Sequence, residues 1–130
     1  MMLERLKEAA RAARKHAYCP YSGYPVGAAL LDESGAVHAG CNVENAAYPV
    51  GQCAERNALG QLIASGAREV HAALVLTQDG APPCGACLQA LSEFIRDPQT
   101  VRVWLCDDAG ETQEWRFADL LPVRFQARND

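Results

Sequence analysis

The first stretch of the chain has a helical period. Between residues 2 and 17, apolar side chains recur every three or four positions and charged side chains fill the positions between them. An apolar stripe of this kind is typical of an amphipathic helix that packs on a core. We therefore expect one helix over residues 2–17. The stripe consists of Leu3, Leu6, Ala9, Ala10 and Ala13.

The rest of the chain alternates between strand-like and helix-like segments. Asp-Glu-Ser-Gly at residues 32–35 is typical of a hairpin turn. The nearly continuous apolar run at residues 70–77 is typical of a strand that is covered on both faces. The loop at residues 107–110 is too short for a parallel crossover, so its flanking strands should be antiparallel. Strands are expected at residues 26–31, 36–43, 70–77, 101–106 and 112–116, and helices at residues 53–64, 84–95 and 117–121.

This order of elements indicates the fold class. Read along the chain it is αββαβαββα, in which strands and helices are mixed throughout. Such a pattern predicts an α/β fold, a three-layer α/β/α sandwich with a mixed sheet of about five strands. At 130 residues the chain is expected to form a single domain over residues 1–130 that buries its own core.

The charge balance speaks against a nucleic-acid partner. The formal net charge is -4 and the sequence pI is about 5.3, whereas nucleic-acid binding usually requires a basic face. The segment from Glu4 onward is charged, so no signal peptide is expected, and no stretch is apolar enough for a membrane partner. We therefore expect a cytoplasmic protein whose six cysteines stay reduced, and clustered thiols there favour metal binding or catalysis.

Three cysteines lie where loops turn into predicted helices. Cys53 opens one helix, and Cys84 and Cys87 open another. The first turn of a helix has free N–H donors and a partial positive charge, which stabilise thiolates. Three thiolates can hold Zn²⁺ tetrahedrally and leave one position for water, which is the arrangement of a catalytic zinc site. We expect one zinc ion per chain.

Two neighbours of Cys53 have candidate roles in this site. Glu55 follows Cys53 by two residues, so its carboxylate is expected near the metal as the catalytic acid and base. Three thiolates leave a zinc site with a net charge of -1, which weakens its effect on bound water. A nearby cation would offset that charge. Arg56 is adjacent to Glu55, and we expect it to contact a ligand sulfur.

These motifs resemble those of a known family. Cys53-Ala54-Glu55 together with Pro-Cys-Gly-Ala-Cys at residues 83–87 is similar to the signature of zinc deaminases. Tyr-Cys-Pro-Tyr-Ser at residues 18–22, Val-Gly-Ala-Ala at 26–29 and Asn-Val-Glu-Asn-Ala-Ala-Tyr-Pro at 42–49 resemble the small homotetrameric cytidine deaminases. The likeness spans residues 18–125. It implies hydrolytic deamination of cytidine and 2′-deoxycytidine, as free nucleosides, in pyrimidine salvage.

The resemblance also implies roles for residues that bind the substrate. Asn42 and Glu44 would hold the ribose hydroxyls, and the Ala54 backbone would meet the base carbonyl. Tyr24 occupies the position that packs on the base, where the family has phenylalanine. The family's homotetramer with shared active sites implies that Ala46, Tyr48 and Phe125 reach into a neighbouring subunit's site. Leu88 stands where the family commonly has arginine, which gives Arg56 more of the task of neutralising the sulfurs.

Other interpretations of the same residues remain open. Cys84-Gly-Ala-Cys87 alone also suits thiol–disulfide exchange, which has no use for Cys53 or Glu55. A structural zinc module needs a fourth ligand, and a deaminase of tRNA or single-stranded DNA needs a basic groove. The alternative function is deamination of a cytosine-containing antibiotic of the blasticidin S type, which should lack the segment at residues 42–48. Cys19, Cys41, Cys106, His16, His38 and His71 are expected to have structural roles.

Overall fold

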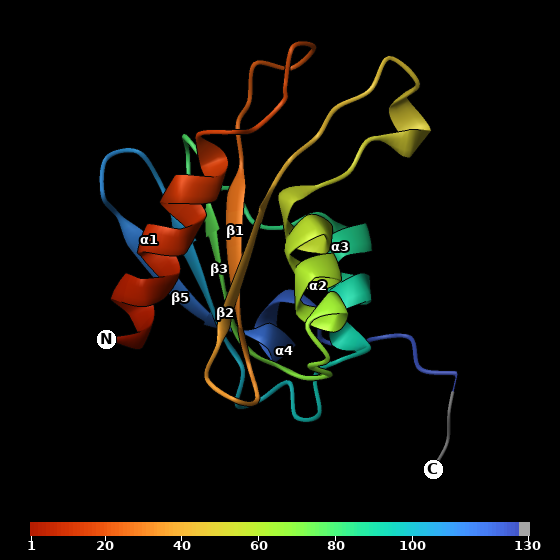
Figure 1. Ribbon diagram of the computed structural model, residues 1–130. Helices are drawn as coiled ribbons and strands as arrows, with labels where there is room; N and C mark the ends of the chain where they lie inside the picture. Colours follow the sequence, from red (N-terminus) through yellow and green to blue (C-terminus); the bar gives the residue numbers. More distant parts are fainter. Residues whose placement is uncertain (128–130) are drawn as a thin grey trace.

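The computed structural model describes residues 1–127 and contains a mixed five-stranded sheet flanked by helices (Figure 1). The sheet order is β2-β1-β3-β4-β5. β3 and β4 are parallel, and every other neighbouring pair is antiparallel. This confirms the mixed sheet expected from the pattern, with the most apolar strand, β3, at its centre. The strands are β1 (Gly27–Asp32), β2 (Val37–Cys41), β3 (Val70–Leu76), β4 (Arg102–Cys106) and β5 (Thr112–Arg116).

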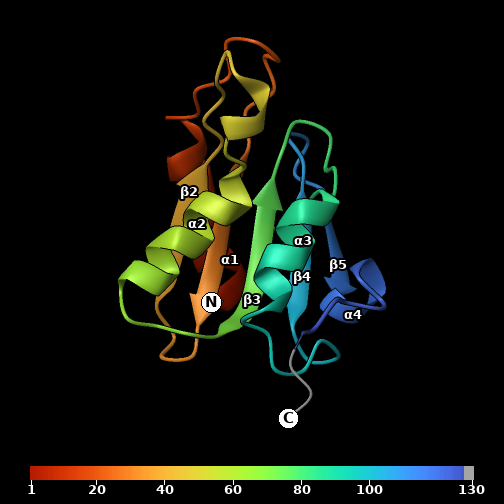
Figure 2. The ribbon, with the colours of Figure 1, turned by 90° about the vertical axis from the view of Figure 1, so that its right-hand side faces the viewer.

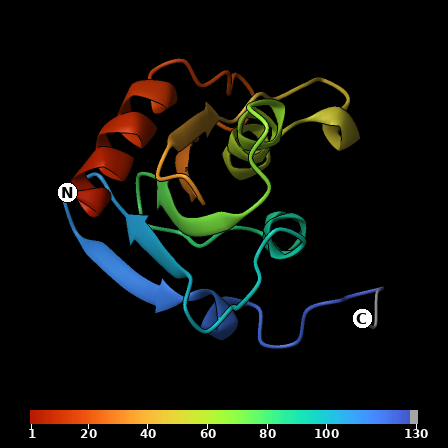
Figure 3. The same ribbon diagram turned by 60° about the horizontal axis from the view of Figure 1, so that its bottom comes forward.

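Helices cover both faces of the sheet. Helix α1 (Met2–Arg14) packs on one face, and α2 (Ala54–Ala64) and α3 (Gly85–Ser92) pack on the other (Figure 3). Each face has its own apolar cluster, because strand side chains alternate between faces. The three-layer α/β/α arrangement is therefore confirmed. The α1 side is centred on Leu6, Ala10, Leu74 and Trp104, and the α2–α3 side on Leu30, Leu62, Leu91, Val103 and Phe117.

Some element ends differ from the expected ones. Helix α1 stops at Arg14 instead of residue 17, and the Arg14 guanidinium turns to donate to the Pro25 carbonyl at 3.1 Å. Strand β2 stops at Cys41 instead of residue 43, and the side chain of the next residue, Asn42, bonds to the backbone of residues 24 and 26. Two short helices complete the described elements, the unforeseen 3-10 helix η1 (Tyr48–Val50) and the expected α4 (Phe117–Leu120). Within residues 1–127, no helix has the length and apolar character needed to cross a membrane.

Helices α2 and α3 begin at the same end of the sheet (Figure 2). Helix α2 lies close against β2, since a Cβ at Gly40 would come within 2.6 Å of the Ala58 nitrogen. The Asn57 amide also donates to the Cys41 carbonyl at 2.7 Å. Glycine at position 40 thus lets the helix approach the strand, which fixes where α2 begins relative to the sheet.

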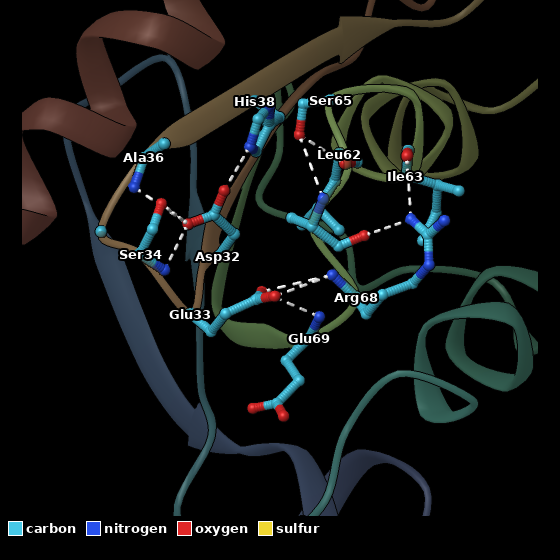
Figure 4. Close-up of polar contacts among 12 residues, drawn as sticks. Asp32, Glu33, Ser34, Ala36, His38, Leu62, Ile63, Ser65, Arg68 and Glu69 are labelled. Atoms are coloured by element: carbon cyan, nitrogen blue, oxygen red, sulfur yellow. Dashed lines mark hydrogen bonds and ion pairs between the residues drawn. The ribbon is translucent and has the colours of Figure 1, made fainter.

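The opposite end of the sheet is held by two carboxylates (Figure 4). Asp32, only 3% exposed, accepts hydrogen bonds from the Ser34 and Ala36 amides and contacts His38 Nε2 at 2.7 Å. Glu33 accepts from the backbone amides of residues 68 and 69, which connect α2 to β3. The β1–β2 turn is therefore held by bonds within itself and by bonds to the α2–β3 connection. It lies at the end of the sheet opposite to the N-termini of α2 and α3.

Candidate metal centre and substrate pocket

Three cysteine sulfurs converge where α2 and α3 begin. Cys53 is the N-cap of α2, Cys84 is the N-cap of α3, and Cys87 lies in the first turn of α3. Their Sγ atoms all lie within 4.8 Å of one another. Tetrahedral zinc with Zn–S bonds of about 2.3 Å separates its sulfurs by about 3.8 Å, so these three positions fit that ion. Both helix N-termini point their free amides toward the cluster, which favours thiolates.

The Arg56 guanidinium faces the cysteine cluster. Its Nη2 donates to Cys53 Sγ at 3.6 Å. Its Nε is buried without a hydrogen-bond partner among the described residues. The pKa of Cys53 is lowered to about 5, first because the Cys87 thiol donates to it and further because of Arg56. The arrangement thus favours negative charge on the Cys53 sulfur, whereas the pKa of Cys87, which donates to it, is raised.

Glu55 is the buried carboxylate of the site. It lies one residue after the start of α2, is 5% exposed and borders the same cavity as Cys53 and Cys84. Burial raises its pKa above the ordinary carboxyl value, and the nearby Cys53 charge acts in the same direction. A buried carboxyl group whose pKa is raised above its ordinary value holds a proton more readily, which suits a residue that must both accept and return one.

A cavity of about 580 Å³ opens beside these groups. This volume lies in the range typical of small-molecule sites. The cavity runs from the α2 N-terminus to the two long loops at residues 15–26 and 42–53, which extend together beyond the sheet (Figure 1). The sequence-predicted residues that border it are Tyr24, Asn42, Glu44, Tyr48, Cys53, Ala54, Glu55, Arg56 and Cys84.

Asn42 and Glu44 join the two loops. The Asn42 Oδ1 accepts from the Val26 amide at 3.0 Å, and its Nδ2 donates to the Tyr24 carbonyl at 2.9 Å. One N–H and one lone pair of that amide remain for a ligand. The Glu44 carboxylate accepts from the Ser22 hydroxyl and from the backbone amides of residues 21 and 22, and the Ser22 hydroxyl is the main cause of its lowered pKa. Both side chains are therefore held rigidly at the cavity wall.

The residues expected to reach a neighbouring subunit lie on the surface. Tyr48 and Phe125 are 78% and 72% exposed. Tyr48 touches the cavity of its own chain, whereas Ala46 and Phe125 do not. Phe125 is held on the outside of α3 by a pair of backbone hydrogen bonds with the Gln89 side chain, at 2.9 and 3.2 Å. Within one chain, the structure thus separates Ala46 and Phe125 from the other candidate residues.

Some residues of the site escape the sequence interpretation. Ser22, Gln52 and Thr77 border the cavity, and Asp79, which is not among the lining residues, accepts a hydrogen bond from the Tyr24 hydroxyl. Thr77 shapes the loop before Cys84, since its hydroxyl accepts from the amides of residues 80 and 81. Thr77 could have been found from the sequence, because it is a polar residue at the end of a buried apolar strand. The other contacts join residues far apart in sequence, for which the pattern carries no signal.

Comparisons with known proteins agree with this geometry. Residues 2–103 match the family model of the cytidine and deoxycytidylate deaminase zinc-binding region. A cytidine deaminase of Sporosarcina psychrophila is 42% identical over 127 residues, covering 96% of this chain and 92% of the relative. One from Halalkalibacterium halodurans is 44% identical over 126 residues, covering 95% and 93%.

A solved structure extends the agreement to the fold. The cytidine deaminase of Burkholderia pseudomallei superposes with a TM-score of 0.88 at 43% identity, covering 96% of this chain and all of that one, 100%. The zinc-binding family model and the cluster of three sulfurs together identify the metal as zinc. With its fold, its thiolate cluster and its sequence in agreement, the chain belongs to the cytidine and deoxycytidylate deaminase family.

Proposed function

We propose that this chain catalyses the hydrolytic deamination of cytidine and 2′-deoxycytidine to uridine, 2′-deoxyuridine and ammonia, in pyrimidine salvage. The observation that carries the proposal is a buried carboxylate, Glu55, beside three converging cysteine sulfurs in a cavity of nucleoside size. The resemblance of the whole chain to cytidine deaminases supports the choice of substrate.

The metal would be held by the three thiolates. Cys53, Cys84 and Cys87 bind one zinc ion per chain, and Glu55 stays outside the ligand set because it is needed for proton transfer. When bound, zinc supplies a Lewis acid that lowers the pKa of water and makes a hydroxide nucleophile available at neutral pH. Arg56 and the amides of the two helix N-termini withdraw charge from the sulfurs, which keeps that Lewis acid effective.

Glu55 carries the protons between water and base. Its carboxylate accepts a proton from the attacking water and passes it to the ring nitrogen N3. It then takes the remaining proton from the new hydroxyl on C4 and passes it to the exocyclic amine, so that ammonia leaves and the carbonyl forms. The buried position raises the Glu55 pKa, which brings proton uptake and release closer in free energy. Because this residue acts while charge develops, its contribution falls mainly on kcat.

The cavity wall orients the nucleoside. Asn42 and Glu44 hold the ribose hydroxyls with their remaining hydrogen-bonding capacity, and both are already fixed by the neighbouring loop. Tyr24 packs on the pyrimidine, and the Ala54 backbone at the start of α2 meets the base carbonyl. The acidic net charge of -4 favours a free nucleoside over a nucleotide or a nucleic acid.

We propose a homotetramer that shares its active sites. The support lies in large apolar side chains that the single chain leaves in solvent, among them Tyr48 at the cavity and Phe125 on the outside of α3. Gly60 adds support, because a glycine inside a helix is unfavourable by about 1 kcal/mol and, within residues 1–127, no atom would lie within 4 Å of a Cβ added there. We place the enzyme in the cytoplasm, since its six cysteines are all free.

A comparison of candidate substrates tests this function. Purified, zinc-replete protein is given cytidine, 2′-deoxycytidine, cytidine monophosphate, blasticidin S and a cytosine-containing oligonucleotide, and product formation is followed optically or by chromatography. We expect kcat/KM to be highest for the two nucleosides. A higher value for blasticidin S would replace the proposal with antibiotic deamination, and a higher value for the oligonucleotide would replace it with nucleic-acid editing.

A further inference from the structure

The hydroxyl of Tyr24, a residue that borders the cavity, makes a contact with a second loop. It donates to Asp79 Oδ1 at 2.5 Å, between residues 55 positions apart in sequence. Tyr24 lies in the loop before β1, and Asp79 lies in the loop that leads from β3 to Cys84. The bond therefore joins the segment that carries the aromatic ring to the segment that carries part of the metal site.

Asp79 is itself held in place by its own loop. The Thr77 hydroxyl donates to Asp79 Oδ1 at 3.3 Å and also accepts from the Gly80 and Ala81 amides at 2.7 and 3.0 Å. Thr77 is buried and borders the cavity. At position 80 the backbone has φ +76°, a conformation that favours glycine. Asp79 is exposed, but its carboxylate is tied to its own loop through Thr77, and the tip of the loop at residues 20–26 is exposed as well.

The ionisation of the two groups suits this contact. Burial, and after it the bond to Asp79, raises the pKa of the Tyr24 phenol. The same bond is the main cause of the lowered pKa of Asp79. At neutral pH a neutral phenol therefore donates to an ionised carboxylate, which is a stronger hydrogen bond than one between two neutral groups.

We propose that Asp79 is a positioning residue, which acts through the Tyr24 hydroxyl to fix the aromatic ring in the orientation that packs on the pyrimidine. The inference rests on the proposed function. A ring that is already fixed loses less conformational freedom when the base binds. Since the ring contacts the base in both the ground state and the transition state, the benefit appears in KM and leaves kcat nearly unchanged.

A double-mutant cycle tests this role in the full-length, zinc-replete enzyme. The variants are Tyr24→Phe, Asp79→Ala, their combination, and Asp79→Asn, which keeps an oxygen acceptor. We expect each of the first two to raise the KM for cytidine about two- to tenfold with little change in kcat. The combination should be no worse than either alone, and Asp79→Asn should restore most of the loss. Glu111→Gln, a charge removal in the β4–β5 turn, is the matched control and should leave KM unchanged.

A second readout does not depend on turnover. Hydrogen–deuterium exchange of the segment at residues 18–26 should be faster in Tyr24→Phe and Asp79→Ala than in the wild type, and unchanged in Asp79→Asn and Glu111→Gln. An additive loss in the cycle, or exchange at residues 18–26 that Asp79→Ala leaves unchanged, would overturn the role of Asp79. Wild-type protein that fails to convert cytidine yet shows the expected exchange would instead refute the proposed function alone.

Discussion

The negative charge on the three cysteine sulfurs is the main electrostatic problem of the site. Three thiolates and one Zn²⁺ carry a net charge of -1, which weakens the effect of the metal on water. The structure supplies two compensating features, the amides of two helix N-termini and the Arg56 guanidinium. Leu88 is buried and adds no second cation, so we expect Arg56 to be the side chain that offsets the negative charge on the sulfurs.

Replacing any one cysteine of the cluster should release the metal. In Cys53→Ala, Cys84→Ala and Cys87→Ala, two thiolates remain, too few to hold zinc in a tetrahedral catalytic site. We expect less than one zinc ion per two chains by atomic absorption after dialysis against a weak chelator. Cys19→Ala, outside the cluster, is the matched control and should retain zinc. Full zinc content in any of the three variants would contradict the assigned ligand set.

Removing Arg56 should weaken catalysis while leaving the fold intact. Arg56→Ala deletes the donor to Cys53 Sγ, so more negative charge stays on the ligands. We expect kcat to fall about 10- to 100-fold, as is typical when a partner of a metal ligand is lost, and zinc to be released faster to a chelator. Arg11→Ala, on the exposed side of α1, is the control. Unchanged kcat and zinc release in Arg56→Ala would remove Arg56 from the mechanism.

The hairpin of β1 and β2 is the element whose stability depends most clearly on pH. The pKa of Asp32 is strongly lowered, first by the hydrogen bond with His38 and further by the Ser34 hydroxyl and by backbone amides. A lowered folded-state pKa gives stability that is complete above the unfolded value of about 3.9 and is lost as the pH falls below it.

Asp32→Ala should remove this contribution. Loss of the buried acceptor leaves several donors of the turn without a partner, which costs about 2 kcal/mol in the free energy of unfolding at pH 7. Urea unfolding between pH 7 and pH 3 should show the wild type and the variant converging as the pH falls. Asp97→Ala, a loop carboxylate, serves as the control. Curves that remain parallel over this range would contradict the assignment of the acid-sensitive group.

The sequence predicts these elements well where the signal is local. The strand at β3 follows from its continuous apolar run, and the cysteine positions follow from their spacing at helix starts. The 3-10 helix η1 lacks such a period and was not foreseen. The apolar period predicts helix α1 as far as residue 17, but after Arg14 the amides of His16 and Ala17 bond three residues back, in a turn that periodicity does not distinguish from a helix.

The contacts of the candidate site also fall into two groups, those that local sequence predicts and those that depend on tertiary structure. Cys53 and Glu55 are two residues apart, so their proximity is a local consequence of one helix turn. The Tyr24–Asp79 contact spans 55 positions and depends on how two loops meet above the sheet. Ala46 and Phe125 lie outside the cavity of their own chain. Their expected role therefore depends on assembly and belongs to the whole molecule.

Whether the assembled molecule shares its active sites between subunits can be tested by complementation between two variants. Glu55→Gln lacks the proton carrier but keeps Phe125, whereas Phe125→Ala keeps Glu55. If Phe125 serves a neighbour's site, mixed tetramers from co-expression contain sites in which both residues are native. We expect such mixtures to regain activity above the mean of the two parents, at sizes that sedimentation identifies as tetramers.

The control for this experiment separates shared from independent sites. Co-expression of Glu55→Gln with Cys84→Ala should give no recovery, because both residues belong to the same chain's site. Mixtures of Glu55→Gln and Phe125→Ala that never exceed the parental mean would contradict the shared-site account. So would a stable monomer with full activity.

We propose that Glu55 carries protons in a zinc-dependent deamination, and a comparison of the wild type with Glu55→Gln tests this role. Wild type and Glu55→Gln are compared for zinc content, for uridine affinity and for the rate of conversion of cytidine to uridine by ultraviolet absorbance. We expect equal zinc content and similar uridine affinity in the two proteins, with kcat lowered at least about 10³-fold in the variant. A variant that keeps zinc, binds uridine and deaminates cytidine within about tenfold of the wild-type rate would contradict it.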